Sequence, residues 1–416
     1  MESTDGPLKL HFQNITRIAG ETLTGRVDID FQQVQQDNLE EVRIKFVGVV
    51  NTKISIKRGN TTTDYRSSIQ LFHVKFPLWT QGTVYPDAGQ HTLSIPFQWT
   101  LPVNLPPSFH CEAYHRNGTV AYSLEVVGQR AGMFRFNRRI RRVLQIVPAA
   151  LPHQLAIKES LMQGWTGQWK SYSKEDKLRR GIWGDYAHAR ARLTLPDVPS
   201  FPIGATIPFS LYIETDTKPM DRKDAPEAPV DKHGKPLFPA PPQDSSLVSL
   251  KIHRWSQVRA KNYTRTVDDN FTLTGGLGEA RKESIAAVGH TLTPAVWIPA
   301  GLDEKGGGKG VWRRSLRLDS KMTLVFAPTF QTEIIQCAYQ IKISIDFPGI
   351  GNDLKLEIPI QLDPGTACPP PPIGAAGGSG ATYADVPPPG PPPQFMDLPP
   401  SYFAGNHHSW DADEKS

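Results

Sequence analysis

Two stretches of the chain, Gly20-Glu-Thr-Leu-Thr-Gly-Arg-Val-Asp-Ile29 and Gly204-Ala-Thr-Ile-Pro-Phe-Ser-Leu-Tyr-Ile213, share one pattern of small, polar and apolar residues. A second pair, Ala121-Tyr-Ser-Leu-Glu-Val126 and Ala338-Tyr-Gln-Ile-Lys-Ile343, follows in the same order. Apolar residues alternate in each copy, and successive side chains of a strand point to opposite faces. The repeat therefore predicts two β-rich domains of one kind, an all-β protein.

Length and composition agree with this organisation. The 416 residues suit two sandwiches and a tail. Three widely separated cysteines make a disulfide framework improbable and indicate a reducing compartment. No apolar run approaches the roughly 18 residues that span a bilayer, and the first residues lack a secretory pattern. We therefore expect a cytoplasmic protein.

The charge is unevenly distributed. The chain carries a net charge of +5, and five acidic residues and one lysine from Pro364 onward give the tail −4 and the body +9. A basic body suits peripheral contact with an anionic membrane face, but its charge is too diffuse to indicate nucleic acid.

Turn signals and alternating runs divide the chain into four parts. Residues 7–148 predict the first sandwich, with strand-like runs such as 22–29, 41–49, 70–76, 91–100, 119–127 and 138–146. Asn117-Gly118 is typical of a hairpin turn. A connector follows over 149–184, in which Ser173-Lys-Glu-Asp176 could cap a short helix.

The second sandwich is predicted over 185–363, with two loop insertions at 218–245 and 275–310. From 364 to 416 the sequence is rich in proline and small residues, so it cannot build a core, and we expect a disordered, extended tail.

The sharpest motif lies in this tail, at Pro399-Pro400-Ser401-Tyr402. Two prolines preset an extended helix, and the tyrosine two residues later falls on the same face, as in the Pro-Pro-x-Tyr ligands of WW domains. Pro399, Pro400 and Tyr402 are the predicted contacts. Pro106-Pro107-Ser108-Phe109 lacks the tyrosine hydroxyl and is interpreted as a structural turn.

A basic run, Phe134-Arg-Phe-Asn-Arg-Arg-Ile-Arg-Arg142, has two interpretations. Its arginines could contact phosphate or lipid headgroups. The structural alternative, which we favour, is an edge strand kept from aggregating by charge. The arginines concerned are Arg135, Arg138, Arg139, Arg141 and Arg142.

Signatures of catalysis and of bound groups are missing from the sequence. No His/Cys cluster has metal-ligand spacing, and Gly306-Gly-Gly-Lys-Gly310 lacks the hydroxyl residue and spacing of a phosphate loop. We expect neither an enzyme nor a metal or cofactor site.

These segments together resemble the arrestin fold, and in particular the α-arrestin (arrestin-domain-containing) family in its fungal form. The resemblance is carried by Gly20–Ile29, Leu105-Pro-Pro-Ser-Phe109, Val120-Ala-Tyr-Ser-Leu124, Pro202-Ile-Gly-Ala-Thr206 and Leu356-Glu-Ile-Pro-Ile360. It implies two tandem immunoglobulin-like, arrestin-type β-sandwiches. Visual and β-arrestins have a helix where this chain has three prolines within Leu101–Phe109, which forbid one.

The family resemblance implies a non-enzymatic adaptor. The sandwiches would engage the cytosolic face of a membrane transporter or receptor at the plasma membrane or endosomes. The tail would recruit a HECT-type ubiquitin ligase through its WW domains, leading to ubiquitination and endocytosis of the cargo. The alternative is an arrestin-fold trafficking-coat or signalling scaffold, including ambient-pH signalling, that acts without a ligase.

Overall fold

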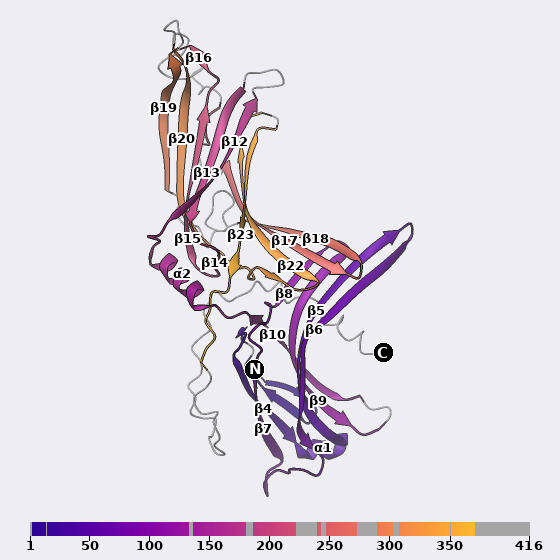
Figure 1. The fold of residues 1–416 in the computed structure, drawn as a ribbon. Helices are drawn as coiled ribbons and strands as arrows, with labels where there is room; N and C mark the ends of the chain where they lie inside the picture. The colour runs from indigo at the N-terminus through magenta and orange to yellow at the C-terminus, as the bar shows by residue number, and fades with distance from the viewer. Residues whose placement is uncertain are drawn as a thin grey trace.

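The computed structural model describes residues 2–13, 15–132, 136–179, 186–221, 239–242, 247–272, 289–302, 308–349 and 351–370. They form two β-sandwiches joined end to end, as predicted (Figure 1). Within these residues no helix is long and apolar enough to cross a membrane.

The first sandwich packs a four-stranded sheet on a five-stranded one. The first sheet has the order β1 (Glu2–Asp5), β2 (Leu8–His11), β4 (Thr22–Asp30) and β7 (Thr92–Thr100). The second has the order β10 (Arg138–Leu144), β9 (Arg116–Arg130), β5 (Leu39–Arg58) and β6 (Thr61–Thr80), with β8 (Phe109–Ala113) also on β9. Helix α1 (Phe31–Asp37) follows β4, and a short parallel pair joins β3 (Arg17–Ile18) to β11 (Ile146–Val147).

The second sandwich repeats this plan. One sheet has the order β12 (Trp169–Arg179), β13 (Tyr186–Pro196), β15 (Thr206–Asp216), β20 (Gly308–Thr323) and β16 (Met220–Asp221), with β19 (Gly289–Leu302) also on β20. The other has β18 (Tyr263–Thr272), β17 (Val248–Ala260), β22 (Ile335–Asp346) and β21 (Phe330–Gln331), with β23 (Asp353–Ile360) also on β22. Helix α2 (Pro152–Gln163) joins the sandwiches, and β14 (Phe201–Pro202) pairs in parallel with β24 (Leu362–Asp363).

The repeated segments occupy equivalent places in the two sandwiches. Strands β4 and β15 hold the duplicated stretch, and each is preceded by a short strand from a parallel pair. The turn between them contains Gly20 in one copy and Gly204 in the other, with φ of 87° and 74°. Only glycine adopts this backbone conformation without strain, which explains why both copies carry it.

The alternation in the second repeat marks the core. Tyr122 on β9 and Tyr339 on β22 are each 1% exposed. The Tyr122 hydroxyl donates to the Pro106 carbonyl oxygen at 2.6 Å. Ser108 Oγ accepts from the Ile146 amide at 2.9 Å. Pro106–Phe109 therefore has the structural role that the sequence predicted, but the turn lies at Val103-Asn104 and Phe109 begins β8; residues 101–108 contain no helix.

Two local predictions are wrong. Ser173–Asp176 caps no helix, because Trp169–Arg179 is strand β12, paired with β13 along its length. Asn117-Gly118 is not a turn either, since the β8–β9 hairpin turns at Tyr114-His115. Gly118 serves another purpose: a Cβ there would lie 2.8 Å from Val258 of the second sandwich, so the glycine permits close domain contact.

The described chain does not end with the last strand. Residues 364–370, which we call the strap, run from the second sandwich to the first. The Thr366 carbonyl accepts from the Ala150 amide at 2.8 Å, and the Gly365 carbonyl accepts from Lys158 Nζ at 2.7 Å. Cys368 Sγ lies 3.4 Å from the Cβ position at Gly20. The tail therefore leaves from the first sandwich.

Candidate functional site

The predicted WW ligand cannot be placed, since Pro399, Pro400 and Tyr402 lie outside the described residues, which end at Pro370. Arg135 is also outside them. These residues stay predictions from the sequence.

The other arginines of the basic run lie on β10, an edge strand, where alternation divides them between two faces. Arg138 Nε donates to Asp37 Oδ2 at 2.7 Å, and this bond raises the pKa of Arg138. Arg141 Nε lies 3.3 Å from Glu125 Oε1. Both contacts fit the structural interpretation, and Arg139 and Arg142 lie on opposite faces of the strand. A phosphate-binding role for this run stays a prediction.

A better-formed cationic site lies where the sandwiches meet. A groove of about 910 Å³ is lined on one side by β5, β6 and β9 and on the other by Arg259, Lys261, Glu333 and Ile334 of the second sandwich. Its cations are Lys53, Arg66, Arg259 and Lys261, and Glu333 is the one acidic residue among its described lining residues. We call it the junction groove.

Hydrogen bonds between the sandwiches fix the walls of the junction groove. Thr52 Oγ1 donates to the Arg259 carbonyl at 2.6 Å, and the Lys261 amide donates to Ser67 Oγ at 2.9 Å. Lys261 has a φ of 53° at the turn between β17 and β18, so its backbone leaves the strand direction there. The wall is therefore set by domain docking.

The carboxylate of Asp64 balances part of the positive charge of the junction groove. Lys53 Nζ lies 2.9 Å and Arg66 Nη2 lies 3.7 Å from Asp64 Oδ2. Bonds from Ser55 and then Lys53 lower the pKa of Asp64, so this carboxylate stays charged. Arg259 and Lys261 are exposed at the opposite wall. Such a groove can bind an anionic segment, and the asparagine, serine and threonine side chains that also line it can donate hydrogen bonds.

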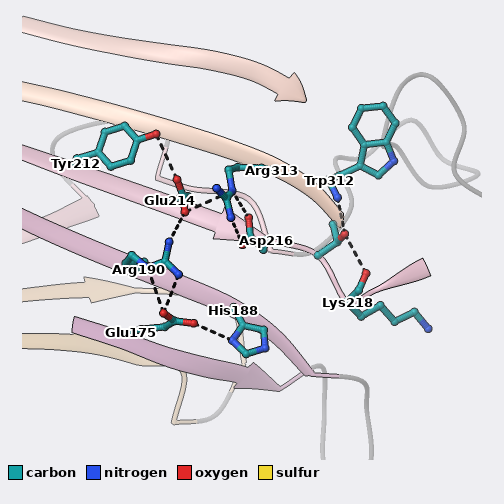
Figure 2. Close-up of polar contacts among 10 residues, drawn as sticks. Glu175, His188, Arg190, Tyr212, Glu214, Asp216, Lys218, Trp312 and Arg313 are labelled. Carbon is teal, nitrogen blue, oxygen red and sulfur yellow. Dashed lines mark hydrogen bonds and ion pairs between the residues drawn. The ribbon is translucent and has the colours of Figure 1, made fainter. Parts of the chain in front are cut away.

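A second charged cluster has a structural role. Glu175, Arg190, Glu214, Arg313 and Asp216 form a ladder of alternating sign across β12, β13, β15 and β20 (Figure 2). Arg190 Nη1 donates to Glu214 Oε1 at 2.7 Å, and Arg313 donates to both oxygens of Asp216 at 2.8 Å. Every charge faces an opposite one on the neighbouring strand, which fixes strand register.

Among the described residues, no group of three or more His, Cys, Asp or Glu side chains could hold a metal ion.

The junction groove was not predicted from the sequence. Lys53 and Lys261 lie 208 positions apart in the sequence, one in each sandwich, and only domain docking brings them to one surface.

Comparison with known families agrees with the fold. Residues 9–151 match the family model of the arrestin (or S-antigen) N-terminal domain. No curated protein matches the chain. The first sandwich is therefore an arrestin N-terminal domain, and an arrestin domain suggests a trafficking adaptor or scaffold. The fungal character inferred from the sequence stays a prediction.

Proposed function

We propose that this protein is a non-enzymatic adaptor that holds an anionic cytosolic segment of a membrane transporter or receptor in the junction groove. The observation that carries the proposal is the groove's positive charge at a wall built from both sandwiches: four cations line it against the carboxylate of Glu333, and Asp64, beside Lys53 and Arg66, balances only part of the excess. Acidic or phosphorylated segments complement such a surface, and the surrounding field speeds their encounter.

The second half of the proposal concerns the tail. Pro399, Pro400 and Tyr402 recruit the WW domains of a HECT-type ubiquitin ligase, and the bound ligase then modifies the cargo and promotes its endocytosis. The sequence motif is the support for this step. Tethering raises the effective concentration of the ligase at the cargo, so the adaptor needs no chemistry of its own. The protein would be cytoplasmic and recruited to the plasma membrane or endosomes.

Proximity labelling in cells separates the two halves. We expect Tyr402→Ala to lose the ligase and keep the cargo. We expect the double variant Arg259→Glu, Lys261→Asn to lose the cargo and keep the ligase; asparagine suits the positive φ at residue 261. The matched control, Lys177→Glu with Lys355→Gln, removes the same charge elsewhere and should change neither set.

Two results would contradict the proposal. An unchanged cargo set in the groove variant would exclude the junction groove as the cargo site. Ligase labelling by Tyr402→Ala would remove Pro399–Tyr402 from the mechanism and favour the scaffold alternative that acts without a ligase.

A further inference from the structure

A second groove continues from the junction groove along β6. It has a volume of about 810 Å³, and Ile69 and Glu333 line both grooves. The rest of its lining is mostly apolar and comes from both sandwiches, with Leu71, Leu105 and Phe330 among its side chains. We call it the apolar groove. Because the two grooves share lining residues, one extended segment can lie in both.

The apolar groove offers surface that a further side chain can cover. Leu71 is the extra residue of a β-bulge between Gln70 and Phe72 on β6. Leu71 and Phe330 are half-buried and pack against the hydrophobic core, so part of each side chain stays in contact with water. Covering that surface with another apolar side chain is favourable.

The four cations of the junction groove lie at one level along β6. Lys53 on β5 pairs with Arg66 on β6. The backbones of Arg259 and Lys261 are bound by the next pair of residues on those two strands. An anionic stretch of a bound segment is therefore attracted to a single place in the groove.

The apolar side chains lie a fixed distance beyond this level. Ser67, beside the cations, and Leu71 are four residues apart, which is roughly 13 Å at about 3.3 Å per residue of a strand. Glu333 is exposed between the two grooves, and its carboxylate repels acidic side chains from the apolar one. Charge thus separates the acidic and the apolar part of any segment that lies in both.

We propose that the anionic segment held by the junction groove carries a bulky apolar residue about four residues from its acidic residues, and that this apolar residue binds in the apolar groove. This assignment rests on the proposed function, since one segment occupies both grooves. The cations select the acidic residues, and burial against Leu71 and Phe330 selects the apolar one.

Fluorescence anisotropy of labelled peptides with the wild-type full chain tests the pairing, at about 20 mM salt, where charge contacts are little screened. Two peptides carry two adjacent glutamates and a leucine four residues to the N-terminal or to the C-terminal side, because a segment can enter from either end. One of them should bind at least about fivefold more tightly than its counterpart with serine in place of leucine, since the leucine is buried. A leucine moved next to the glutamates should lose this gain.

Variants of the full chain locate the leucine. Leu71→Gln makes the lining polar, so it should bind the leucine and serine peptides equally within about twofold and keep the wild-type affinity for the serine peptide. Leu292→Gln, the same change at a 43% exposed leucine of β19, is the matched control and should keep the preference for leucine. The double variant Arg259→Glu, Lys261→Asn should weaken the binding of both peptides, because it removes the charge they share.

The outcomes separate this inference from the proposed function. Equal affinity of the wild type for the leucine and serine peptides would overturn the role of the apolar groove and leave the junction groove as the cargo site. A preference for leucine that persists in Leu71→Gln would overturn it as well. No binding of any peptide, or binding that the charge variant leaves unchanged, would overturn the proposed function and this inference with it.

Discussion

The ring of Phe109, in the first sandwich, lies under the guanidinium of Arg254, in the second, with 5.0 Å between the ring centre and Cζ. Arg254 is 5% exposed and donates from Nε and Nη2 to Asp269 at 3.0 and 2.7 Å. Phe330 packs edge-on against Phe109, with ring centres 5.0 Å apart. A side chain of the Leu-Pro-Pro-Ser-Phe segment thus anchors one domain in the other, and it covers the buried guanidinium of the Arg254–Asp269 ion pair.

The first prediction concerns this anchor. Phe109→Ala should lower the free energy of unfolding by about 3–5 kcal/mol, because it empties a packed site and exposes Arg254 to water. Urea denaturation monitored by circular dichroism measures the change. Phe136→Ala, at an 89% exposed residue, is the control and should stay within about 0.5 kcal/mol of wild type. Equal loss in both variants would show that Phe109 anchors nothing.

Close approach at Gly118 leads to a second prediction. In Gly118→Val the new Cβ would lie 2.8 Å from Val258 Cγ1 and 3.0 Å from Ile335 Cδ1. We expect the sandwiches to separate, seen as a larger radius of gyration in small-angle X-ray scattering and faster amide exchange in β17. Gly308→Val has open space at its Cβ and is the matched control. An unchanged radius in Gly118→Val would contradict the close contact.

The charge ladder predicts acid sensitivity. Hydrogen bonding from Arg190 lowers the pKa of Glu175 below its ordinary value of 4.5. The folded state therefore binds the proton less readily than the unfolded state. This contribution to stability is complete above pH 4.5 and is lost as pH falls through the lower folded-state pKa. In Glu175→Gln the free energy of unfolding should fall less steeply than in wild type as the pH is lowered below 4.5. In Glu40→Gln, a change at an exposed residue, it should fall as steeply as in wild type.

Because the strap contacts both sandwiches, the stability of a C-terminal truncation should depend on whether the strap is kept. A chain ending at Asp363 loses the bonds to Ala150 and Lys158, so it should melt several degrees below wild type. A chain ending at Pro370 keeps them and should melt with wild type while losing the ligase. Thermal unfolding followed by pulldown with an isolated WW domain separates the two cuts. Equal melting temperatures would mean that the strap contributes no stability.

The sequence predicted the double sandwich because burial imposes alternation on each strand, as at Tyr122 and Tyr339. It was misleading where polar residues form an exposed strand: Ser173–Asp176 looks like a helix start, but β12 is held by pairing with β13. The predicted turn at Asn117-Gly118 was wrong because a glycine required for close packing cannot be distinguished, in sequence, from a glycine required for a turn.

The candidate site was harder to predict than the fold. Lys53 and Arg259 follow no shared pattern, and the groove exists because Thr52 and Ser67 bind the β17–β18 turn. Long-range docking of this kind leaves no periodic signal along one chain. The Pro-Pro-x-Tyr motif is the opposite case, recognisable in sequence and outside the described residues.

The strap also limits how far from the folded domains a partner of the C-terminal motif can be held. Twenty-nine peptide steps separate Pro370 from Pro399. At full extension they reach at most roughly 100 Å, at about 3.3–3.6 Å each. Because Cys368 lies against the turn at Gly20, that radius is centred on the rim of the first sandwich. A ligase that binds at Tyr402, as proposed, would have its WW domain held inside this sphere, so the orientation of the first sandwich on its client would bias which lysines that ligase reaches.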